Sequence, residues 1–228
     1  MLIEKLLMSK KLTLMINLDR TLLHTTADHV VGIECHESLN RWGSEDLGWR
    51  LTKIRPYTKQ FLHSMSQLFE LRICTNAPRS YAEKMAQLLD EDGLLFGKRI
   101  HSCDNLEENK RHSKTGHLTN LFPGGKHTVI IVDYKKDKWN STTNLIRVKP
   151  YKFFFRGSDN KMTVPIFDAD DCLLHLETRL RQIHANFFAS YEPSSNLPLP
   201  NIKKMVARLK RKSNRRNKFQ RGLQMKRM

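Results

Sequence analysis

The sequence has no apolar run long enough to cross a lipid bilayer, which takes about 20 consecutive residues, so we expect no membrane segment. The apolar start of the chain is interrupted by Glu4, Lys5, Lys10 and Lys11, and we therefore expect no signal peptide there. Cysteine is scarce as well. The four cysteines form no CxxC pair, which argues against a disulfide framework or a zinc site and favours a reducing compartment.

Acidic residues are absent from positions 201 to 228, a segment that holds twelve Lys or Arg residues. The whole chain has a formal charge of +17, so the first 200 residues carry only +5 of it. A basic tail of this kind is typical of a nuclear address, and it could also contact nucleic acid or importin. The predicted nuclear localisation residues are Lys210, Arg211, Lys212, Arg215 and Arg216.

What the sequence does contain is sufficient for one folded domain. Hydrophobic residues make up 39% of the 228 positions, which supports a real core. The stretch EPSSNLPLP, rich in Pro and Ser, indicates a linker. We therefore predict a domain over residues 1–192 and a linker with a basic tail over residues 193–228.

Short apolar stretches alternate with amphipathic ones along this domain. The predicted strands are 12–16, 71–75, 127–134 and 145–148, and the predicted helices are 58–69, 78–90 and 170–191. Thr58 is a plausible cap for the first of these helices. Residues 24–50 show no sustained period and predict a long loop that could hold a short hairpin. The alternation itself predicts an α/β fold, a parallel sheet wrapped by helices.

Polar residues stand at the carboxyl ends of the predicted strands, where parallel sheets bind their ligands. Asn17 and Asp19 follow the first strand, Thr75 and Asn76 end the second, and Asp133 ends the third. Carboxylates at such a point can hold a hard divalent cation, while hydroxyl groups and backbone N–H groups suit a phosphate. Each residue alone could simply cap the next helix; the set favours a site for magnesium-assisted phosphoryl transfer.

Several motifs of the chain resemble those of one family. NLDRT (17–21) stands where that family has D-x-D-x-T/V, and KIRPYTKQFL (53–62) is similar to its K-x-R-P-x-T-x-x-F-L. ICTNAPRSY, SKTGHLTNLFP and VDYKKDKW are similar to its later motifs. The family is that of the FCP-type phosphatases, which act on the C-terminal domain (CTD) of RNA polymerase II within the haloacid dehalogenase superfamily. The resemblance covers residues 11–190 and implies a haloacid-dehalogenase-like, Rossmann-like sheet in an FCP homology domain.

The resemblance also implies a mechanism. The first Asp of the opening motif attacks the phosphoserine phosphorus, and the second protonates the leaving serine and then activates water. Asp19 takes the role of general acid/base, and Asn17 stands at the nucleophile position. The implied phosphate-binding residues are Thr75, Asn76 and Lys114. The implied Mg²⁺ ligands are Asp133, the Asp19 backbone carbonyl, Asn17 as a weak ligand and Asp137 as a further one.

Two positions depart from the family pattern in the same direction. Asn17 is a neutral carboxamide whose oxygen is a poor nucleophile, and Tyr134 replaces the second Asp of the magnesium pair. Losing the nucleophile of a cooperating set costs on the order of a millionfold in rate. We therefore expect a catalytically impaired protein, a pseudophosphatase whose magnesium site is weakened.

Two classes of function remain open at this point. In the first, the protein binds the phosphorylated RNA polymerase II CTD or another phosphoserine protein without turning it over. In the second, it is an active magnesium-dependent protein serine/threonine phosphatase that dephosphorylates the CTD despite Asn17. Both imply a nuclear protein. Family members often continue into a BRCT domain, and we expect none in this chain.

Overall fold

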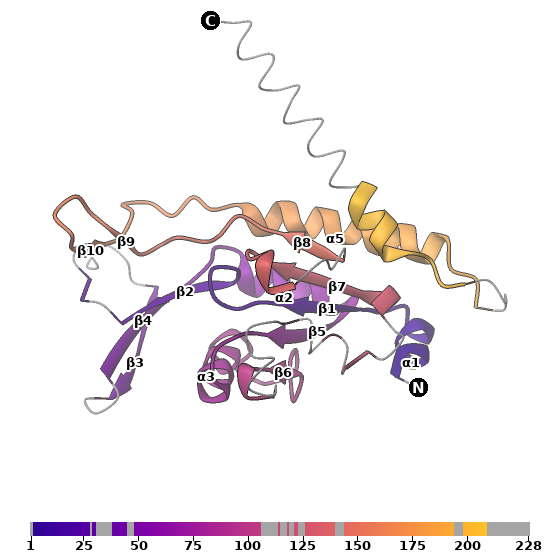
Figure 1. Cartoon of the computed structure of the whole chain (residues 1–228), viewed down its shortest axis with the longest axis horizontal. Coiled ribbons are helices and arrows are strands. Elements are labelled where there is room, and N and C mark those ends of the chain that lie inside the picture. Colours follow the sequence, from indigo (N-terminus) through magenta and orange to yellow (C-terminus); the bar gives the residue numbers. More distant parts are fainter. Residues whose placement is uncertain are drawn as a thin grey trace, which may run out of the picture.

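A parallel sheet of five strands forms the centre of the molecule (Figure 1). The computed structural model describes residues 2–27, 29–30, 38–44, 48–105, 114, 118, 121–122, 126–139, 144–193 and 198–208. The strand order is β6-β5-β1-β7-β8, and every neighbouring pair is parallel. The strands are β1 (Leu12–Ile16), β5 (Phe69–Cys74), β6 (Ile100–His101), β7 (Val129–Asp133) and β8 (Leu145–Arg147).

Both faces of the sheet are buried, which is why β1 and β7 consist of apolar residues with only isolated polar positions. On β1, Leu12, Leu14 and Ile16 point into the main core, while Met15 belongs to a second core on the other face. Residues of α2 (Thr58–Ser66), α3 (Arg79–Leu89) and α5 (Cys172–Ala189) fill the main core. Leu118, Phe122 and Trp139 fill the second.

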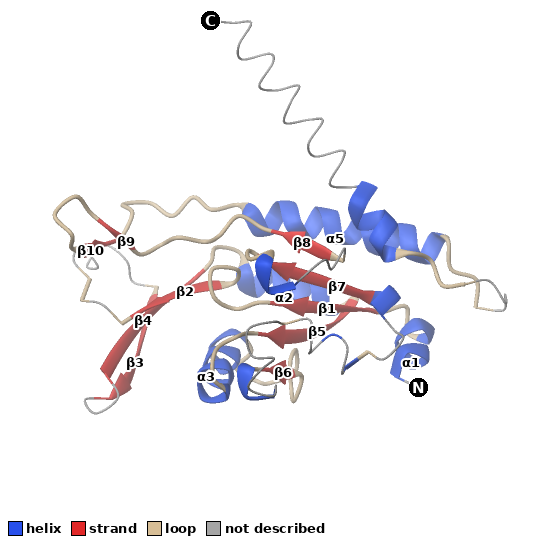
Figure 2. Cartoon of the chain, in the orientation of Figure 1, coloured by secondary structure: helices blue, strands red, loops and turns tan. Residues whose placement is uncertain are grey.

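The helices bury the faces that their apolar spacing predicts. On α5 the buried residues repeat every three or four positions: Leu173, Leu176, Leu180, Ile183 and Phe187. Helix α2 packs against β5 and α5, and Figure 2 shows these blue helices alongside the red strands. A short helix, α1 (Leu2–Met8), precedes β1. The predicted strands and helices of the core are thus confirmed, with ends shifted by a few residues.

A small antiparallel sheet extends beyond the carboxyl end of β1 (Figure 1, left). It consists of β2 (Leu23–Thr26), β4 (Gly48–Ile54) and β3 (Leu39–Ser44), in that order. Gly43 has a φ of +122°, and a Cβ atom there would lie 2.3 Å from the Gly48 carbonyl oxygen. Strands β3 and β4 form the short hairpin that the sequence left open within residues 24–50, whereas the expectation of a loop was wrong for β2.

A further hairpin, β9 (Phe155–Arg156) and β10 (Met162–Thr163), is bridged through Met162 to Val30, which follows β2 in the sequence. Val30, Tyr151, Phe153, Phe154 and Val164 make a third core under it. Short 3₁₀ turns at η2 (Cys103–Asn105), η4 (Lys126–Thr128) and η5 (Asp137–Trp139) complete the described elements.

Two details differ from the sequence-based expectations. Thr58 does not cap α2: Tyr57 is the N-cap, and the Thr58 hydroxyl donates to the carbonyls of Leu22 and Arg55. The helical turn at 202–208 is not separate from the fold, because Ile202 and Val206 lie in the main core. The division at residue 192 stays a prediction. The nuclear localisation residues 210–216 lie outside the described part of the chain.

Among the described helices, none combines the length and the apolar character that crossing a bilayer requires.

Candidate phosphate site at the strand ends

Three parallel strands bring the predicted site residues together. Asn17 follows β1, Asp133 ends β7 and Thr75 follows β5, with β1 lying between the other two strands. Lys114 joins them from a distant part of the chain. Its Nζ donates to Asn17 Oδ1 at 2.6 Å and to Asp133 Oδ2 at 2.8 Å. All four side chains are buried, so the lysine is an internal cation of this site.

The hydrogen bonds of Asn17 fix which way its carboxamide points. Lys114 can only donate, so it must face the oxygen, and the Asp19 backbone carbonyl can only accept, so it must face the nitrogen. Asn17 Nδ2 donates to that carbonyl at 2.7 Å and to Thr21 Oγ1 at 3.2 Å. Both of its N–H groups are therefore used, and the amide ties the β1 end to the following turn.

Asp133 is held by donors on both of its oxygens. Oδ2 accepts from Lys114 and from the indole Nε1 of Trp139, each at 2.8 Å, and Oδ1 accepts from the Lys135 amide at 3.0 Å. The Trp139 side chain is fully buried and lies 5.7 Å from the Lys114 ammonium, measured to its ring centroid. Sequence reasoning missed this hydrogen bond between Trp139 and the site.

Asp19, the expected general acid/base, is hydrogen-bonded to a side chain of α3. Its Oδ1 accepts from the Tyr81 hydroxyl of α3, which is also 3.0 Å from Thr25 Oγ1. Burial raises the pKa of the Asp19 carboxyl, while the Tyr81 hydrogen bond and the Lys114 charge act against that shift. Burial, followed by the Asp19 charge, raises the pKa of Tyr81, so the phenol stays a donor. Sequence reasoning missed Tyr81, because an aromatic residue on an amphipathic helix gives no sign of its partner.

The segment after β5 carries the other predicted phosphate ligands. The Thr75 side chain is buried, and its Oγ1 accepts from the Ala77 amide at 3.1 Å. The Ala77 amide is thus engaged within the turn, whereas the Thr75 hydroxyl proton can still be donated. Asn76 lies between them in the same turn. Cys74, the last residue of β5, is fully buried, and burial raises its thiol pKa to about 12, which argues against a nucleophilic role.

Arginines near the site serve the fold. Arg55 is almost fully buried and pairs with Asp170, with Nε 2.7 Å from Oδ1 and Nη2 2.9 Å from Oδ2. Arg79 pairs with Glu83 on α3 and donates to the Ile100 carbonyl. Both arginines are therefore engaged in ion pairs within the fold.

The predicted magnesium ligands do not form an open set of oxygens. The Asp19 carbonyl and Asn17 Oδ1 each accept from a nitrogen donor, Asp133 Oδ2 accepts from two, and Asp137 is exposed. The Tyr134 carbonyl accepts from Arg147 Nε at 3.1 Å, and the Tyr134 ring packs against the main core. A hard divalent cation requires several free oxygens, so these residues fit it poorly as arranged. The described residues hold no group of three or more His, Cys, Asp or Glu suited to a metal.

The site can still accept an anion. An ammonium group has three N–H donors, and Lys114 uses two of them on Asn17 and Asp133. The third donor, together with the Thr75 hydroxyl, suits a phosphate oxygen. A neutral residue at position 17 also removes the repulsion that a carboxylate would exert on that phosphate.

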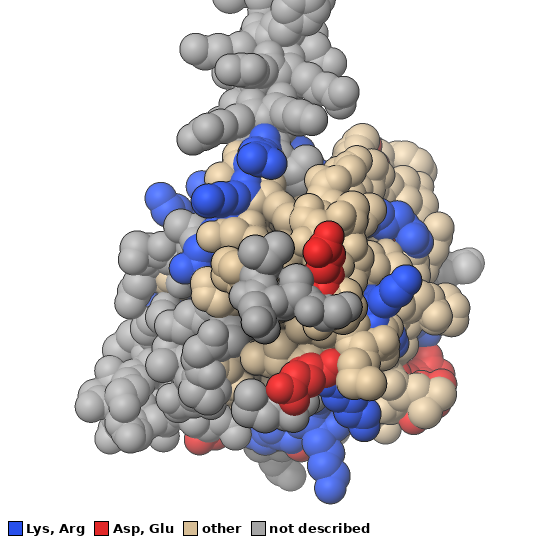
Figure 3. Space-filling view, turned by 90° about the vertical axis from the view of Figure 1, so that its right-hand side faces the viewer, with Lys and Arg blue, Asp and Glu red and all other residues tan. Residues whose placement is uncertain are grey.

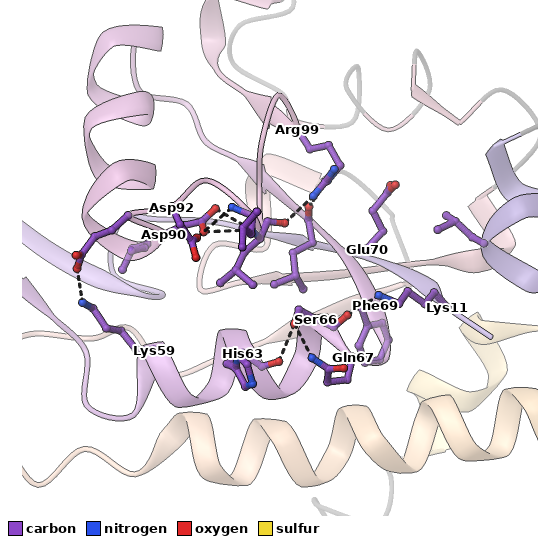
Figure 4. Close-up of a pocket in the computed structure, with 16 residues that line it drawn as sticks. Lys11, Lys59, His63, Ser66, Gln67, Phe69, Glu70, Asp90, Asp92 and Arg99 are labelled. Carbon is purple, nitrogen blue, oxygen red and sulfur yellow. Dashed lines mark hydrogen bonds and ion pairs between the residues drawn. The ribbon is translucent and has the colours of Figure 1, made fainter. Parts of the chain in front are cut away.

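A hollow of about 950 Å³ lies at the opposite end of the sheet, between α2, α3 and the start of β5 (Figure 4). Its charged groups are engaged by one another, by the backbone or, for Glu70, by the neighbouring Arg72. Lys59 pairs with Glu91, Asp90 accepts from the Leu95 and Phe96 amides, and Lys11 donates to the Ser66 carbonyl. This hollow is therefore a poor candidate for chemistry.

Comparison with known proteins gives a consistent picture. Residues 12–186 match the family model of NLI interacting factor-like phosphatases. An RNA polymerase II C-terminal domain phosphatase of Caenorhabditis elegans is 34% identical over 201 residues, which cover 83% of this chain and 30% of that protein. The human protein of the same name is 40% identical over 155 residues, covering 66% of this chain and 16% of its own length. The chain thus spans less than a third of either relative.

The fold also matches solved structures. A structure of the fission yeast RNA polymerase II CTD phosphatase Fcp1 bound to beryllium fluoride superposes with a TM-score of 0.79 and 24% identity. The match covers 92% of this chain and 73% of the yeast chain. The predicted haloacid-dehalogenase-like fold is thereby confirmed.

Proposed function

The chain belongs to the NLI interacting factor-like phosphatase family, and from this premise we propose that it binds phosphoserine proteins while being catalytically impaired. Relatives named RNA polymerase II CTD phosphatases make the phosphorylated CTD the first ligand to consider. A CTD ligand also implies action in the nucleus, with which the predicted localisation residues in the basic tail agree.

The observation that carries the proposal is the state of Asn17. In the implied mechanism, a carboxylate oxygen forms a bond to phosphorus while the serine oxygen leaves with a proton from the acid. The Asn17 oxygen is uncharged and accepts from Lys114, and its nitrogen is held by the Asp19 carbonyl and Thr21. A group held in this way cannot supply the attacking electron pair. A rate loss on the order of a millionfold follows.

Binding needs less than chemistry does, and the groups for binding are present. Lys114 and Thr75 each keep a donor, and Asn76 lies in the turn next to Thr75. Burial strengthens the attraction between the ammonium and an incoming phosphate, because the surroundings screen it less than water does. We propose that Lys114, whose charge is paired with Asp133, holds a bound phosphoserine through its remaining N–H donor.

Magnesium chemistry is weakened in this proposal. When bound, Mg²⁺ would neutralise phosphate charge and orient the reacting group. Here Asp133 Oδ1 would remain its best ligand, because Tyr134 offers a protonated phenol and the Asp19 carbonyl is engaged by Asn17. Phosphopeptide binding should therefore change little when magnesium is removed with a chelator.

The alternative is an active magnesium-dependent serine/threonine phosphatase. One observation favours it: burial raises the pKa of Asp19, which suits a general acid. A binder does not require an acid, because no serine oxygen leaves. The two functions therefore differ in turnover.

An activity assay separates them. We would measure hydrolysis of an aryl phosphate and of a phosphorylated CTD peptide with magnesium, using wild type, Asn17→Asp and Asn17→Asp/Tyr134→Asp. Wild type should be inactive, and the double variant should be faster by about a thousandfold or more. Asn186→Asp, an exposed position on α5, is the matched charge control and should stay inactive.

Three outcomes decide the matter. Wild-type turnover near that of the double variant would show that the protein is an active phosphatase. A folded but inactive double variant would refute the assignment of site roles. If a phosphoserine peptide binds with equal affinity when Lys114 is replaced by Met in protein that still folds, binding comes from elsewhere, such as the tail. Mass spectrometry of the wild-type protein should also show that Asn17 has not deamidated, because deamidation to Asp would restore a carboxylate at this position.

A further inference from the structure

A second, smaller hollow lies beside the strand-end site. It has a volume of about 590 Å³ and lies at the carboxyl ends of β7 and β8. We call it the β7–β8 hollow. It is lined by Tyr134, Lys135, Lys136, Asp137, Arg147 and Pro150. The hollow has three cationic side chains, those of Lys135, Lys136 and Arg147, and one carboxylate, that of Asp137. None of these four forms an ion pair with another residue that the structure describes.

The β7–β8 hollow is connected to Asp133 through the backbone. The Lys135 amide donates to Asp133 Oδ1 at 3.0 Å, and Arg147 is the register partner of Asp133 across the two strands. Arg147 Nε donates to the Tyr134 carbonyl at 3.1 Å. The hollow therefore has a fixed position relative to the strand-end site. The guanidinium is oriented by this bond, and its two terminal nitrogens make no hydrogen bond to the residues that the structure describes.

We propose that the β7–β8 hollow binds a second phosphate group, carried by the same peptide whose first phosphoserine lies at the strand-end site. This inference rests on the proposed function. A concave surface lined by one sign of charge concentrates the opposite ion. Arginine holds phosphate through its planar fork, and lysine does so as a point charge. Three cations and Asp137 leave a net +2, which matches one phosphoserine, at about −1.5 to −2 near pH 7.

The position of the hollow predicts the spacing of the two phosphates. In the order β5-β1-β7-β8, Arg147 lies two strands away from Asn17. Neighbouring strands are about 4.8 Å apart, so the two anion sites lie roughly 10 Å apart. A peptide in the polyproline II conformation rises about 3.1 Å per residue with three residues per turn, so two phosphoserines about three residues apart face the same side and span this distance.

A peptide is favoured over other polyanions because both sites lie at one edge of one sheet. A nucleic acid or an anionic lipid would use the β7–β8 hollow without needing Lys114, which is buried behind the strand ends. For the peptide, binding at the two sites is coupled, since one chain holds both phosphates.

The test measures affinity for three peptides of one sequence by calorimetry: unphosphorylated, singly phosphorylated, and doubly phosphorylated with two residues between the phosphoserines. The full chain is used, as wild type and as Arg147→Gln, Lys136→Gln and Lys98→Gln. Lys98 is exposed and lies outside the hollow, so it controls for charge alone. Lys136 makes no described side-chain hydrogen bond, so its replacement should not disturb folding even if that of Arg147 does.

Wild type should bind the doubly phosphorylated peptide about tenfold tighter than the singly phosphorylated one. Arg147→Gln and Lys136→Gln should reduce this ratio and leave binding of the singly phosphorylated peptide unchanged, and Lys98→Gln should alter neither. Equal affinity for the two phosphopeptides overturns the second site while the proposed function stands. If neither phosphopeptide binds, both the second site and the proposed function are overturned. A short RNA that binds equally tightly and is weakened by Arg147→Gln overturns the assignment to a peptide.

Discussion

At the scale of single residues, His24 shows how burial turns a titratable side chain into a fixed acceptor. The ring lies under the third core, and its Nδ1 accepts from the backbone amides of Phe153 and Phe154, both at 3.1 Å. Those bonds require Nδ1 without a proton. Burial, followed by the charges of Arg20 and Lys152, lowers the His24 pKa to about 4. The histidine thereby joins β2 to the segment before β9.

A pH dependence of stability follows from this shift. Between about pH 4 and pH 6.5 the unfolded chain binds a proton at His24 that the folded chain does not, so stability falls as the pH is lowered through this window. The full loss from this residue is about 3 kcal/mol. We would measure urea unfolding from pH 4 to pH 7 for wild type and His24→Gln, whose amide oxygen can still accept. A difference between the two proteins that does not change with pH contradicts this account.

The residues of the site differ in how far the sequence could predict them. Asn17, Thr75 and Asp133 were predictable, because polar residues at the ends of apolar strands must meet at one edge of a parallel sheet. The partners Trp139 and Tyr81 were not, since their hydrogen bonds depend on how a 3₁₀ turn and a helix pack. Lys114 was placed by family resemblance, and its bridge between Asn17 and Asp133 appears only in three dimensions.

At the scale of elements, strong periodicity was the reliable signal. The buried stripe of α5 and the apolar strands β1 and β7 follow directly from the spacing of their residues. Of the small sheet β2-β4-β3 only a short hairpin was anticipated, because the alternation of buried and exposed residues in β4 is weak. Its position is set by long-range contacts with α3, where the Tyr81 hydroxyl lies 3.0 Å from Thr25 Oγ1 and the Tyr81 ring lies against the Trp42 ring.

The Arg55–Asp170 pair joins two elements far apart in the sequence, the end of β4 and the start of α5. Replacing Asp170 with Asn keeps the shape and the acceptor for the Cys172 amide, but it leaves the buried Arg55 without a counter-ion. We expect the free energy of unfolding to fall by about 3 kcal/mol.

The matched control for this variant is an exposed pair of equal length. Lys59 and Glu91 are 2.7 Å apart, as Arg55 and Asp170 are, but both of their side chains are mostly exposed. Glu91→Gln should cost less than about 1 kcal/mol, because water screens the pair. Denaturant unfolding of both variants makes the comparison. Similar losses for the two would show that burial of the Arg55 pair does not determine its contribution.

At the scale of the whole molecule, the two ends of the central sheet have different characters. The carboxyl ends of the strands carry the buried Lys114 and the cations of the β7–β8 hollow. The amino ends face the viewer in Figure 3, where acidic and basic side chains are interspersed. Anion binding by the fold is therefore expected at one end only, with the tail acting as a second, separate source of positive charge.

Two truncations test how the tail is attached. Removing residues 209–228 takes away nine Lys and Arg residues and none of the described core, so stability should be unchanged. Removing residues 201–228 also deletes Ile202 and Val206, whose side chains are 0% and 1% exposed, and should lower the free energy of unfolding by about 3 kcal/mol. Both truncations should reduce the salt dependence of binding to a single-stranded RNA, the longer one somewhat more because it removes further cations. Equal stability of the two truncated proteins would show that the helical turn at 202–208 contributes nothing to the fold.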